Sequence, residues 1–413
     1  MIGRDVALPL SEEVRPIADG GDAVRFALSG KRRLPVSQGR WARYTRRGAI
    51  GLIGAAAAAH TLAGAPAASP VRTRFGVNAV RLFLDEISPG GGESRQILAA
   101  LGEQGIPFAR FAASGHWAGE WAGYEADPKR YWSRMDRVFA AAEDSGVALV
   151  PSVFWHVVAL AFHCREPIRA WADPESRTRT IARRYTEAFV ARYDRSPALL
   201  MYEFANELND WVDLPNVLLF WPKRDQTMPE RRPIEQDRLS SVQLRDFVGD
   251  FARTIRARSS KPIGMGSNTP RPNAWHLVRG SWDTDTPDQF TEQFRAINAP
   301  QLDVLSIHTY EDKYGQRGST FATLPELLAA FTKTAALDGR LTFVGEFGIP
   351  TLPDRADERR RFESMVDAIG AARIDYAAVW NYSQKVFQPG LDISPDNDRA
   401  YQLDIIRAAN RMA

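Results

Sequence analysis

Short runs of β-branched and aromatic residues alternate with longer amphipathic stretches along the chain from about residue 74. The short runs have the length and composition of buried strands, and the stretches between them have room for helices. We therefore predict strands at 75–80, 107–111, 147–154, 199–204, 262–266, 304–307, 341–345 and 376–380.

One of the intervening stretches carries clear helix signals. Asp173 can cap a helix whose first residue is Pro174, because an aspartate accepts hydrogen bonds from the first turn and proline suits the first helical position. An apolar residue then recurs at every fourth position from Ile181 to Phe189, which indicates one buried face. Pro197 marks the expected end of this helix.

Eight strands that alternate with helices fit a (β/α)8 barrel, the TIM-barrel fold, formed by residues 71–413 as a single domain. An open, doubly wound sheet is the alternative. It should show a glycine-rich phosphate-binding turn after an early strand, which this sequence lacks. In a barrel all strands end at one face, where the active sites of this fold lie. Polar residues at strand ends are therefore the candidates for chemistry.

Residues 1–70 differ from the rest of the chain in charge and composition. They carry ten Lys and Arg against five Asp and Glu, and since the whole chain has a net charge of +3, the body is left with −2. Arg46 and Arg47 precede an alanine-rich apolar stretch at 49–63, which Ala-Pro-Ala follows at 65–67. This order is typical of an export signal, and the arginine pair indicates the twin-arginine route. An uncleaved membrane anchor is the alternative.

We therefore expect an exported protein, periplasmic or extracellular, without stable membrane association once the signal is removed. The charge of the body gives no reason to expect a nucleic-acid partner. Cys164 is the only cysteine, so no intramolecular disulfide can form. An isolated thiol is more often a small apolar residue of the core than a nucleophile.

Two glutamates at the ends of apolar strands are the strongest catalytic candidates. Glu207 follows the strand that ends at Phe204, and Glu346 lies in the segment Leu-Thr-Phe-Val-Gly-Glu-Phe-Gly. Two carboxylates on one face of a scaffold can break a glycosidic bond, with one as proton donor and the other as nucleophile or as base for water. We expect Glu207 to be the general acid/base and Glu346 the nucleophile. The simpler alternatives are a surface carboxylate at 207 and a structural ion pair between Glu346 and Arg110.

Further polar and aromatic residues end neighbouring strands. His308 and Tyr310 point to the same side of their strand, so Tyr310 can donate a hydrogen bond to Glu346 and His308 can contact a sugar hydroxyl. Asn206 can bind the sugar's 2-hydroxyl, an interaction that strengthens in the transition state. Trp380 offers a flat apolar face on which a sugar ring can stack. Core packing is the plain alternative for the histidine, the tyrosine and the tryptophan.

Other chemistries lack their motifs. The sequence contains no HExxH pair, no cysteine cluster and no P-loop, and Ser114 does not stand in a GxSxG elbow. The histidines lack metal-ligand spacing, which leaves a dispersed metal site as the alternative. We therefore expect no metal and no cofactor.

Together the strand-end residues resemble those of the retaining glycoside hydrolases of clan A, particularly the cellulase-like family five. That family ends successive strands with an arginine, an Asn-Glu pair, a His-x-Tyr motif, a glutamate and a tryptophan. In this sequence the matching residues are Arg110, Asn206 with Glu207, His308 with Tyr310, Glu346 and Trp380. The match follows the family's order over nearly the whole body, which makes it more specific than any single motif.

The resemblance implies that Glu207 is the acid/base and that Glu346 forms a covalent glycosyl-enzyme intermediate with net retention of configuration. It also implies that the other matching residues bind substrate. The family usually adds a histidine on or near the third strand, and we assign His156 to that place in preference to His116. The sequence of this third strand, however, departs from the usual family pattern.

We therefore predict an exported retaining glycoside hydrolase that cleaves β-glycosidic bonds by double displacement. Long segments follow the third, fourth, fifth, sixth and eighth predicted strands, and these loops are similar to those of mannan-active relatives. The expected partner is therefore an oligo- or polysaccharide of the β-glucan or β-mannan type. Two alternatives stand beside this prediction. One is a catalytically silent, carbohydrate-binding barrel, and the other is a transglycosylase of the cell envelope.

Overall fold

The computed structural model describes residues 72–88, 90–219, 233–383 and 390–412, and the expected export segment lies outside these residues. Eight parallel strands close into a barrel in which each strand pairs with its neighbours in sequence and β8 pairs with β1. The strands are β1 (Arg74–Asn78), β2 (Phe108–Ala112), β3 (Ala148–Ser152), β4 (Tyr202–Glu203), β5 (Ile263–Gly264), β6 (Val304–Thr309), β7 (Leu341–Phe347) and β8 (Tyr376–Val379). The predicted (β/α)8 fold is thus confirmed.

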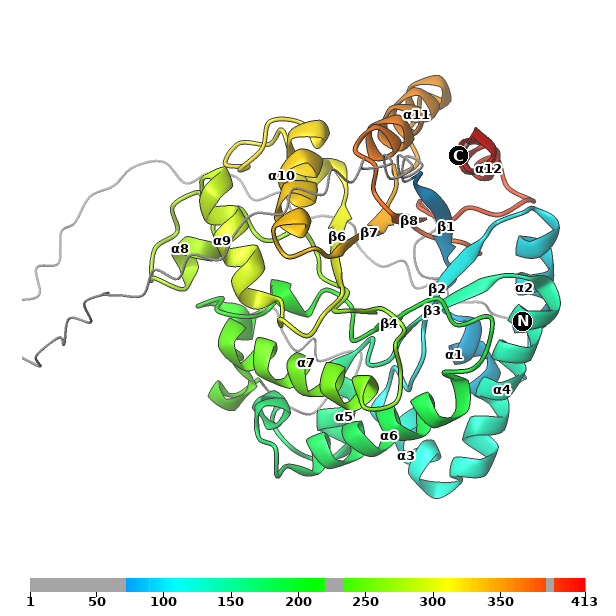
Figure 1. Ribbon diagram of the computed structural model, residues 1–413, viewed down its shortest axis with the longest axis vertical. Coiled ribbons are helices and arrows are strands. Elements are labelled where there is room, and N and C mark those ends of the chain that lie inside the picture. The colour runs from blue at the N-terminus through cyan, green and yellow to red at the C-terminus, as the bar shows by residue number, and fades with distance from the viewer. Residues whose placement is uncertain (1–71, 89, 220–232, 384–389, 413) are drawn as a thin grey trace, which may run out of the picture. The chain divides into compact units, whose positions relative to one another are not determined.

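Helices surround the barrel, as Figure 1 shows, with the strands at the centre of the view. They are α1 (Leu82–Ile87), α2 (Ser94–Glu103), α3 (Ala118–Ala126), α4 (Pro128–Ser145), α5 (Val157–His163), α6 (Arg177–Tyr193), α7 (Ser241–Arg256), α8 (Ala274–Leu277), α9 (Pro287–Ile297), α10 (Leu324–Leu337), α11 (Arg355–Ala371) and α12 (Tyr401–Met412). None of the helices in the described ranges has the length and apolar character needed to cross a bilayer.

The start of α6 differs from the prediction. The helix begins at Arg177, and the hydroxyl of Ser176 accepts the capping hydrogen bond from the Arg179 backbone at 3.1 Å. Asp173 instead ends a 3₁₀ helix at Ile168–Ala172, and its carboxylate accepts from the Glu175 backbone at 2.9 Å. Two residues able to cap stand three positions apart, and the turn at Asp173 leaves the capping role to Ser176.

Strands β4 and β5 are each two residues long, shorter than predicted. The backbone pairing nevertheless continues past the strand ends, because Phe204 donates to Gly264 at 3.0 Å and Ala205 donates to Met265 at 3.1 Å. The register between β6 and β7 shifts after Ile307, which places His308 directly opposite Glu346. The irregular pairing therefore lies at the strand ends where chemistry was expected.

The interior of the barrel has two layers. Residues two apart on a strand point to the same side, so each inward residue of the first layer is followed by an inward residue of the second. The first layer, called here the apolar floor, consists of Phe108, Val150, Met201, Val304, Phe343 and Ala378. Two positions further along β2, β3, β4 and β6 stand the buried polar residues Arg110, Ser152, Glu203 and Ser306. Polar groups therefore begin where the apolar floor ends.

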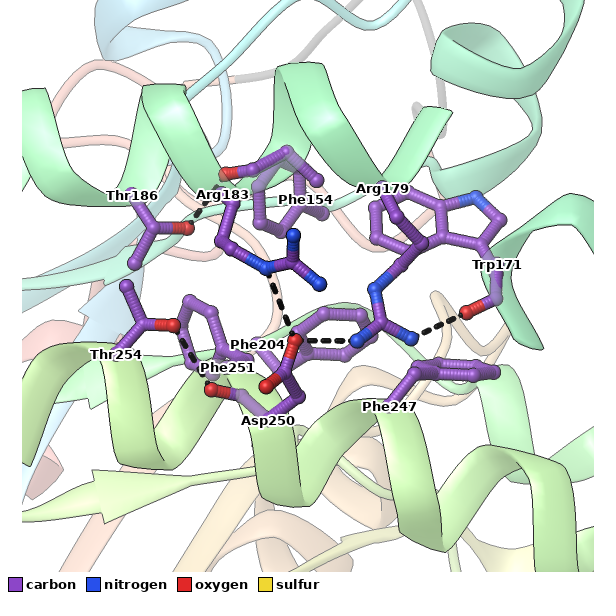
Figure 2. Close-up of a pocket in the computed structure, with 11 residues that line it drawn as sticks. Phe154, Trp171, Arg179, Arg183, Thr186, Phe204, Phe247, Asp250, Phe251 and Thr254 are labelled. Carbon is purple, nitrogen blue, oxygen red and sulfur yellow. Dashed lines mark hydrogen bonds and ion pairs between the residues drawn. The ribbon is translucent and has the colours of Figure 1, made fainter. Parts of the chain in front are cut away.

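A separate small cavity lies between α6 and α7, shown in Figure 2. Aromatic residues line it, and Asp250 forms ion pairs with Arg179 and with Arg183 across the two helices. Its volume of 20 Å³ has room for about one water molecule. We interpret this cavity as part of the packing between helices and barrel.

Candidate active site

The candidate residues come from different strands and meet at one end of the barrel. Each lies in the last residues of a strand or directly after it, where the apolar floor gives way to polar side chains. From β2 comes Arg110, from the end of β4 come Asn206 and Glu207, from β6 come His308 and Tyr310, from β7 comes Glu346, and after β8 comes Trp380.

The two predicted glutamates converge. One carboxylate oxygen of Glu207, Nδ1 of His308 and one carboxylate oxygen of Glu346 all lie within 4.8 Å of one another. His308 bridges the pair, because its Nδ1 lies 2.8 Å from Oε1 of Glu207 and 3.4 Å from Oε1 of Glu346. These residues also form a cluster that could offer a metal ion three ligand atoms. Their separation along the chain is large, so only the closed barrel brings them together.

The backbone at Glu207 has a left-handed conformation, with a φ of 53°. This region is uncommon for residues other than glycine, and such backbone strain often occurs at functional sites. The Glu207 amide donates to the carbonyl of Gly266 at 2.8 Å, which fixes the turn against the chain after β5. The turn places the Glu207 carboxylate beside His308 with 30% of its side chain exposed.

Both carboxyl groups have raised pKa values. Burial is the largest cause at Glu346, and the charge of Glu207 adds to it, whereas His308, Arg110 and Tyr310 act in the opposite direction. At Glu207 burial again raises the pKa, whereas Lys313 and Arg110 lower it. Two carboxyl groups this close cannot both ionise easily, so the charge on one raises the pKa of the other.

His308 is completely buried, and burial lowers its pKa to about 4. The ring is therefore neutral at pH 7. Its Nε2 faces the backbone of Gly345 so closely that an added Cβ there would lie 2.7 Å away. The contact with a sugar hydroxyl stays a prediction. In this structure the ring is covered and its Nδ1 lies beside both carboxylates.

Tyr310 lies where the sequence placed it. Its hydroxyl donates a hydrogen bond to Oε2 of Glu346 at 2.8 Å. Burial and the charge of Glu346 raise the pKa of Tyr310 well above its usual value, so the phenol keeps its proton. It is therefore a permanent donor to this carboxylate.

Arg110 is fully buried and joins the carboxylates to the rest of the site. Its Nη1 donates to Oε1 of Glu346 at 3.0 Å, and its Nη2 donates to Oδ1 of Asn206 at 2.7 Å. The side-chain amide oxygen of Asn206 is thus fixed by the arginine. Its amide nitrogen then has a defined direction in which to meet a ligand.

Aromatic side chains form one wall of the site. Trp380 stacks on Trp155 with ring centroids 6.1 Å apart and an interplanar angle of 23°. Arg110 lies over the Trp155 ring at 4.4 Å from the centroid. His156 follows in the chain, and both its hydrogen bond and its ring stack are with His116, at 3.0 Å and 4.9 Å. Burial lowers the pKa of both histidines.

Several residues of the site were not anticipated. Glu203 binds Arg110, Trp155 supports Trp380, and Asp210 lies in the 3₁₀ turn Leu208–Asp210 directly after Glu207. A cavity of 180 Å³ adjoins Asp210. It is lined by Asp210, Thr269, Pro270, Arg271, Pro272, Phe290, Asp312, Lys313, Ser319, Thr320 and Phe321. A charged residue inside the apolar run 199–204 was the available signal for Glu203.

Cys164 is buried, and burial raises the pKa of its thiol to about 11. The thiol therefore stays protonated near neutral pH, as expected for a small residue of the core. It lies in the turn after α5, outside the group of residues described above.

Comparison with known proteins shows the family and the fold of the chain. Residues 73–386 match the model of the family described as Cellulase (glycosyl hydrolase family 5). A comparison with curated proteins finds no match. Similar solved structures include an endo-1,4-β-mannanase from Rhizomucor miehei, with a TM-score of 0.58 and 13% identity over 82% of this chain and 95% of that chain.

Two further structures are similar. The endo-β-1,4-mannanase from Thermotoga petrophila has a TM-score of 0.57 and 13% identity over 84% of this chain and 77% of that chain. The exo-β-1,4-mannosidase from Opitutaceae bacterium strain TAV5 has a TM-score of 0.53 and 17% identity over 83% of this chain and 60% of that chain. At these identities the likeness shows the fold.

The family match covers most of the barrel, from β1 to the segment after β8. It includes both glutamates and every strand that contributes to the site. The chain therefore belongs to glycosyl hydrolase family 5, the cellulase family, and is a glycoside hydrolase.

Proposed function

We propose that this glycosidase cleaves β-linked oligo- or polysaccharides by double displacement, with Glu346 as nucleophile and Glu207 as general acid/base. The observation that carries the proposal is the short distance between the two carboxylates, whose nearest oxygens lie within 4.8 Å. Retaining enzymes hold their carboxyl groups roughly 5–5.5 Å apart, whereas inverting enzymes need about 6.5–9.5 Å to admit a water molecule.

The hydrogen bonds support this division of roles. Glu346 accepts from Arg110 and from Tyr310, and neither donor loses its proton near neutral pH. Glu207 has the neutral His308 as its near neighbour. In the proposed mechanism Glu207 therefore carries the proton and Glu346 is ionised.

In the first step Glu346 attacks the anomeric carbon while Glu207 gives its proton to the departing oxygen. The bond between that carbon and the leaving group breaks, and an ester to Glu346 forms. In the second step Glu207 takes a proton from water, which attacks the same carbon and releases Glu346. Asn206 is positioned to bind the 2-hydroxyl, and the Trp155–Trp380 stack offers an apolar face to a sugar ring.

The leaving group needs space on the side of the proton donor. The cavity beside Asp210 is a candidate for this space, since Asp210 lies one turn after Glu207 and donates its backbone N–H to the carbonyl of Glu207 at 3.0 Å. Its lining of hydroxyls, arginine, lysine and carboxylates suits a polar sugar. We therefore assign the departing part of the substrate to this cavity.

For the substrate itself we favour a β-1,4-linked mannan, with β-glucan second. The support is the fold shared with the mannanases and the mannosidase named above, together with the long loops predicted after several strands. We also propose export by the twin-arginine route, on the strength of Arg46, Arg47 and the alanine-rich stretch that follows. Replacing both arginines with lysine and following the location of the protein in the source cell tests the export route.

Incubation with fluorinated glycosides that carry good leaving groups tests the enzymatic assignment. We expect slow covalent labelling of Glu346, located by mass spectrometry of peptides, and retained configuration in the first product of hydrolysis. Saturable sugar binding without labelling would identify a silent carbohydrate-binding barrel. Transfer of the sugar to an added acceptor in preference to water would identify a transglycosylase. A panel of mannan, cellulose, xylan and short β-glucosides then decides the substrate.

A further inference from the structure

Glu203 is a carboxylate inside the barrel that the proposed reaction does not use. It lies on β4, two positions after Met201 of the apolar floor and four positions before Glu207, and its side chain is only 2% exposed. A buried carboxylate is costly unless it is paired and hydrogen-bonded. The residue that pairs with Glu203 therefore indicates what Glu203 does.

That partner is Arg110, which Glu203 binds through both carboxylate oxygens. Nε of Arg110 lies 2.9 Å from Oε1 and 3.1 Å from Oε2, and Nη2 lies 2.8 Å from Oε1. Nη1 also donates to Asn78 at 2.9 Å, in addition to its bond with Glu346. Together with the bond to Asn206, every nitrogen of the guanidinium has an acceptor.

The backbone after β5 is shaped to leave room for this pair. Gly266 has a φ of 77°, and an added Cβ would lie 1.8 Å from the Ala205 carbonyl oxygen and 2.7 Å from Cδ of Glu203. Only glycine allows the chain to run this close to the carboxyl group of Glu203. Glu203 is thus held from two sides, by Arg110 and by the chain after β5.

We propose that Glu203 is a positioning residue that fixes the orientation of Arg110 and offsets part of its charge, so that Glu346 stays a strong nucleophile and Asn206 stays aimed at substrate. The inference rests on the proposed function, because it assigns Glu203 a part in the same reaction. Glu203 itself touches neither substrate nor the reacting atoms.

The charge argument depends on all the ionisable groups around Arg110 and Glu346. Arg110 faces Glu203 and Glu346, and Glu346 also faces the groups His308, Tyr310 and Glu207. Lys313, Asp312 and Asp210 also act on the charge of Glu207. Within this group two carboxylates, Glu346 and Glu203, pair with the positive charge of Arg110. Without it the full charge of Arg110 would act on Glu346 and lower the pKa of that nucleophile.

The test is Glu203→Gln in the full-length protein, which keeps the size of the side chain and removes its charge. We expect the acidic limb of the kcat/KM profile to move to lower pH by about one unit, since this limb reports the ionisation of the nucleophile. We expect kcat to fall on the order of 10- to 100-fold, as is common when a supporting residue is lost. KM should change little. Rates are divided by the concentration of sites that the fluorinated glycoside labels.

Glu86→Gln is the matched control. Glu86 is equally buried, forms an ion pair with Arg137 at 2.7 Å and accepts a hydrogen bond from the Ser94 hydroxyl, so its partners lie on α4 and α2 and are not residues of the site. We expect this variant to be less stable than wild type, and we expect the acidic limb of its kcat/KM profile to lie at the same pH as in wild type. An unchanged acidic limb in folded Glu203→Gln would overturn the proposal and leave Glu203 as a neutralising partner needed only for folding.

Glu203→Asp decides the matter if the glutamine variant does not fold. The shorter side chain withdraws the charge from Arg110, so the acidic limb should move in the same direction by a smaller amount, and an unmoved limb again overturns the proposal. Failure of the proposed function itself is recognised separately. In that case wild type would show neither turnover nor labelling of Glu346, whatever the residue at 203.

Discussion

Tyr310 donates a hydrogen bond to Glu346, with 2.8 Å between the phenol oxygen and Oε2 of the carboxylate. The bond joins the end of β6 to the end of β7 and stabilises the ionised form of Glu346. Burial raises the pKa of Glu346, whereas His308, Arg110 and this hydrogen bond lower it and so favour the charged form.

We therefore expect Tyr310→Phe to raise the pKa of Glu346 and to move the acidic limb of kcat/KM to higher pH. A hydrogen bond to a charged group contributes about 1.5–3 kcal/mol, so the pKa of Glu346 should rise by roughly one to two units, and kcat/KM should fall at each pH where Glu346 then becomes protonated. Tyr193→Phe is the control, because Tyr193 donates to Asp136 at 2.6 Å between two outer helices. An acidic limb that stays in place after loss of the Tyr310 hydroxyl would refute the role given to it.

Glu207→Ala should affect substrates unequally. An alkoxide leaving group from a natural glycoside needs a proton from Glu207, whereas an activated aryl leaving group needs little help. We expect a loss of about 10²–10⁴-fold on oligosaccharides and a much smaller loss in the first step with dinitrophenyl glycosides. The two losses are measured with the same preparation, and equal losses would contradict the acid role.

Glu346→Ala should abolish turnover of natural substrates, since no other carboxylate can form the ester. Added azide is expected to restore cleavage of activated glycosides by attacking from the vacant side, which gives a glycosyl azide of inverted configuration. Nuclear magnetic resonance spectra of the product show its configuration. Appreciable hydrolysis by the pure variant without azide would exclude Glu346 as the nucleophile.

Asp210→Asn should shift the alkaline limb of the pH profile of kcat/KM. Burial and the charge of Glu207 raise the pKa of Asp210 to about 6, and the interaction is mutual, so an ionised Asp210 disfavours ionisation of Glu207. Removing this charge is expected to lower the pKa of Glu207 and to move the alkaline limb of kcat/KM to lower pH. Asp213→Asn, in the same loop, serves as control because its carboxylate binds the Ser241 backbone instead.

The same substitution should alter how stability depends on pH. A carboxyl whose pKa is raised by folding stabilises the native state below about pH 4, and that contribution is lost as the pH rises through about 6. Wild type should therefore lose more unfolding free energy between pH 4 and pH 7 than Asp210→Asn does. Urea unfolding at the two pH values measures the difference, and equal changes in both proteins would rule out a raised pKa at Asp210.

The sequence was sufficient to place the groups that depend on strand ends alone. Glu207, Glu346 and Tyr310 follow apolar strands, and a barrel brings all such ends to one face, so their convergence could be predicted without coordinates. The bond from Tyr310 to Glu346 followed from the two-residue repeat of a strand.

Pairings across the barrel could not be predicted in this way. Glu203 and Arg110 lie 93 positions apart, and their contact depends on the register of β2, β3 and β4 when the barrel closes. The complete burial of His308 depends on the shift in pairing after Ile307. The predicted start of α6 was wrong because two nearby residues can both cap a helix, and Ser176 rather than Asp173 does so.

The apolar floor seals one end of the barrel with tightly packed hydrocarbon side chains. Substrate and water must consequently reach the proposed covalent ester from the opposite end of the barrel. In the proposed reaction the first product therefore has to leave before a water molecule can take its place. A sugar that stays bound at this entrance competes with water for attack on the anomeric carbon. The ratio of hydrolysis to transfer of the sugar to an acceptor then depends on how long the first product stays at the entrance. This ratio should respond to acceptor concentration more than to substitutions in the apolar floor.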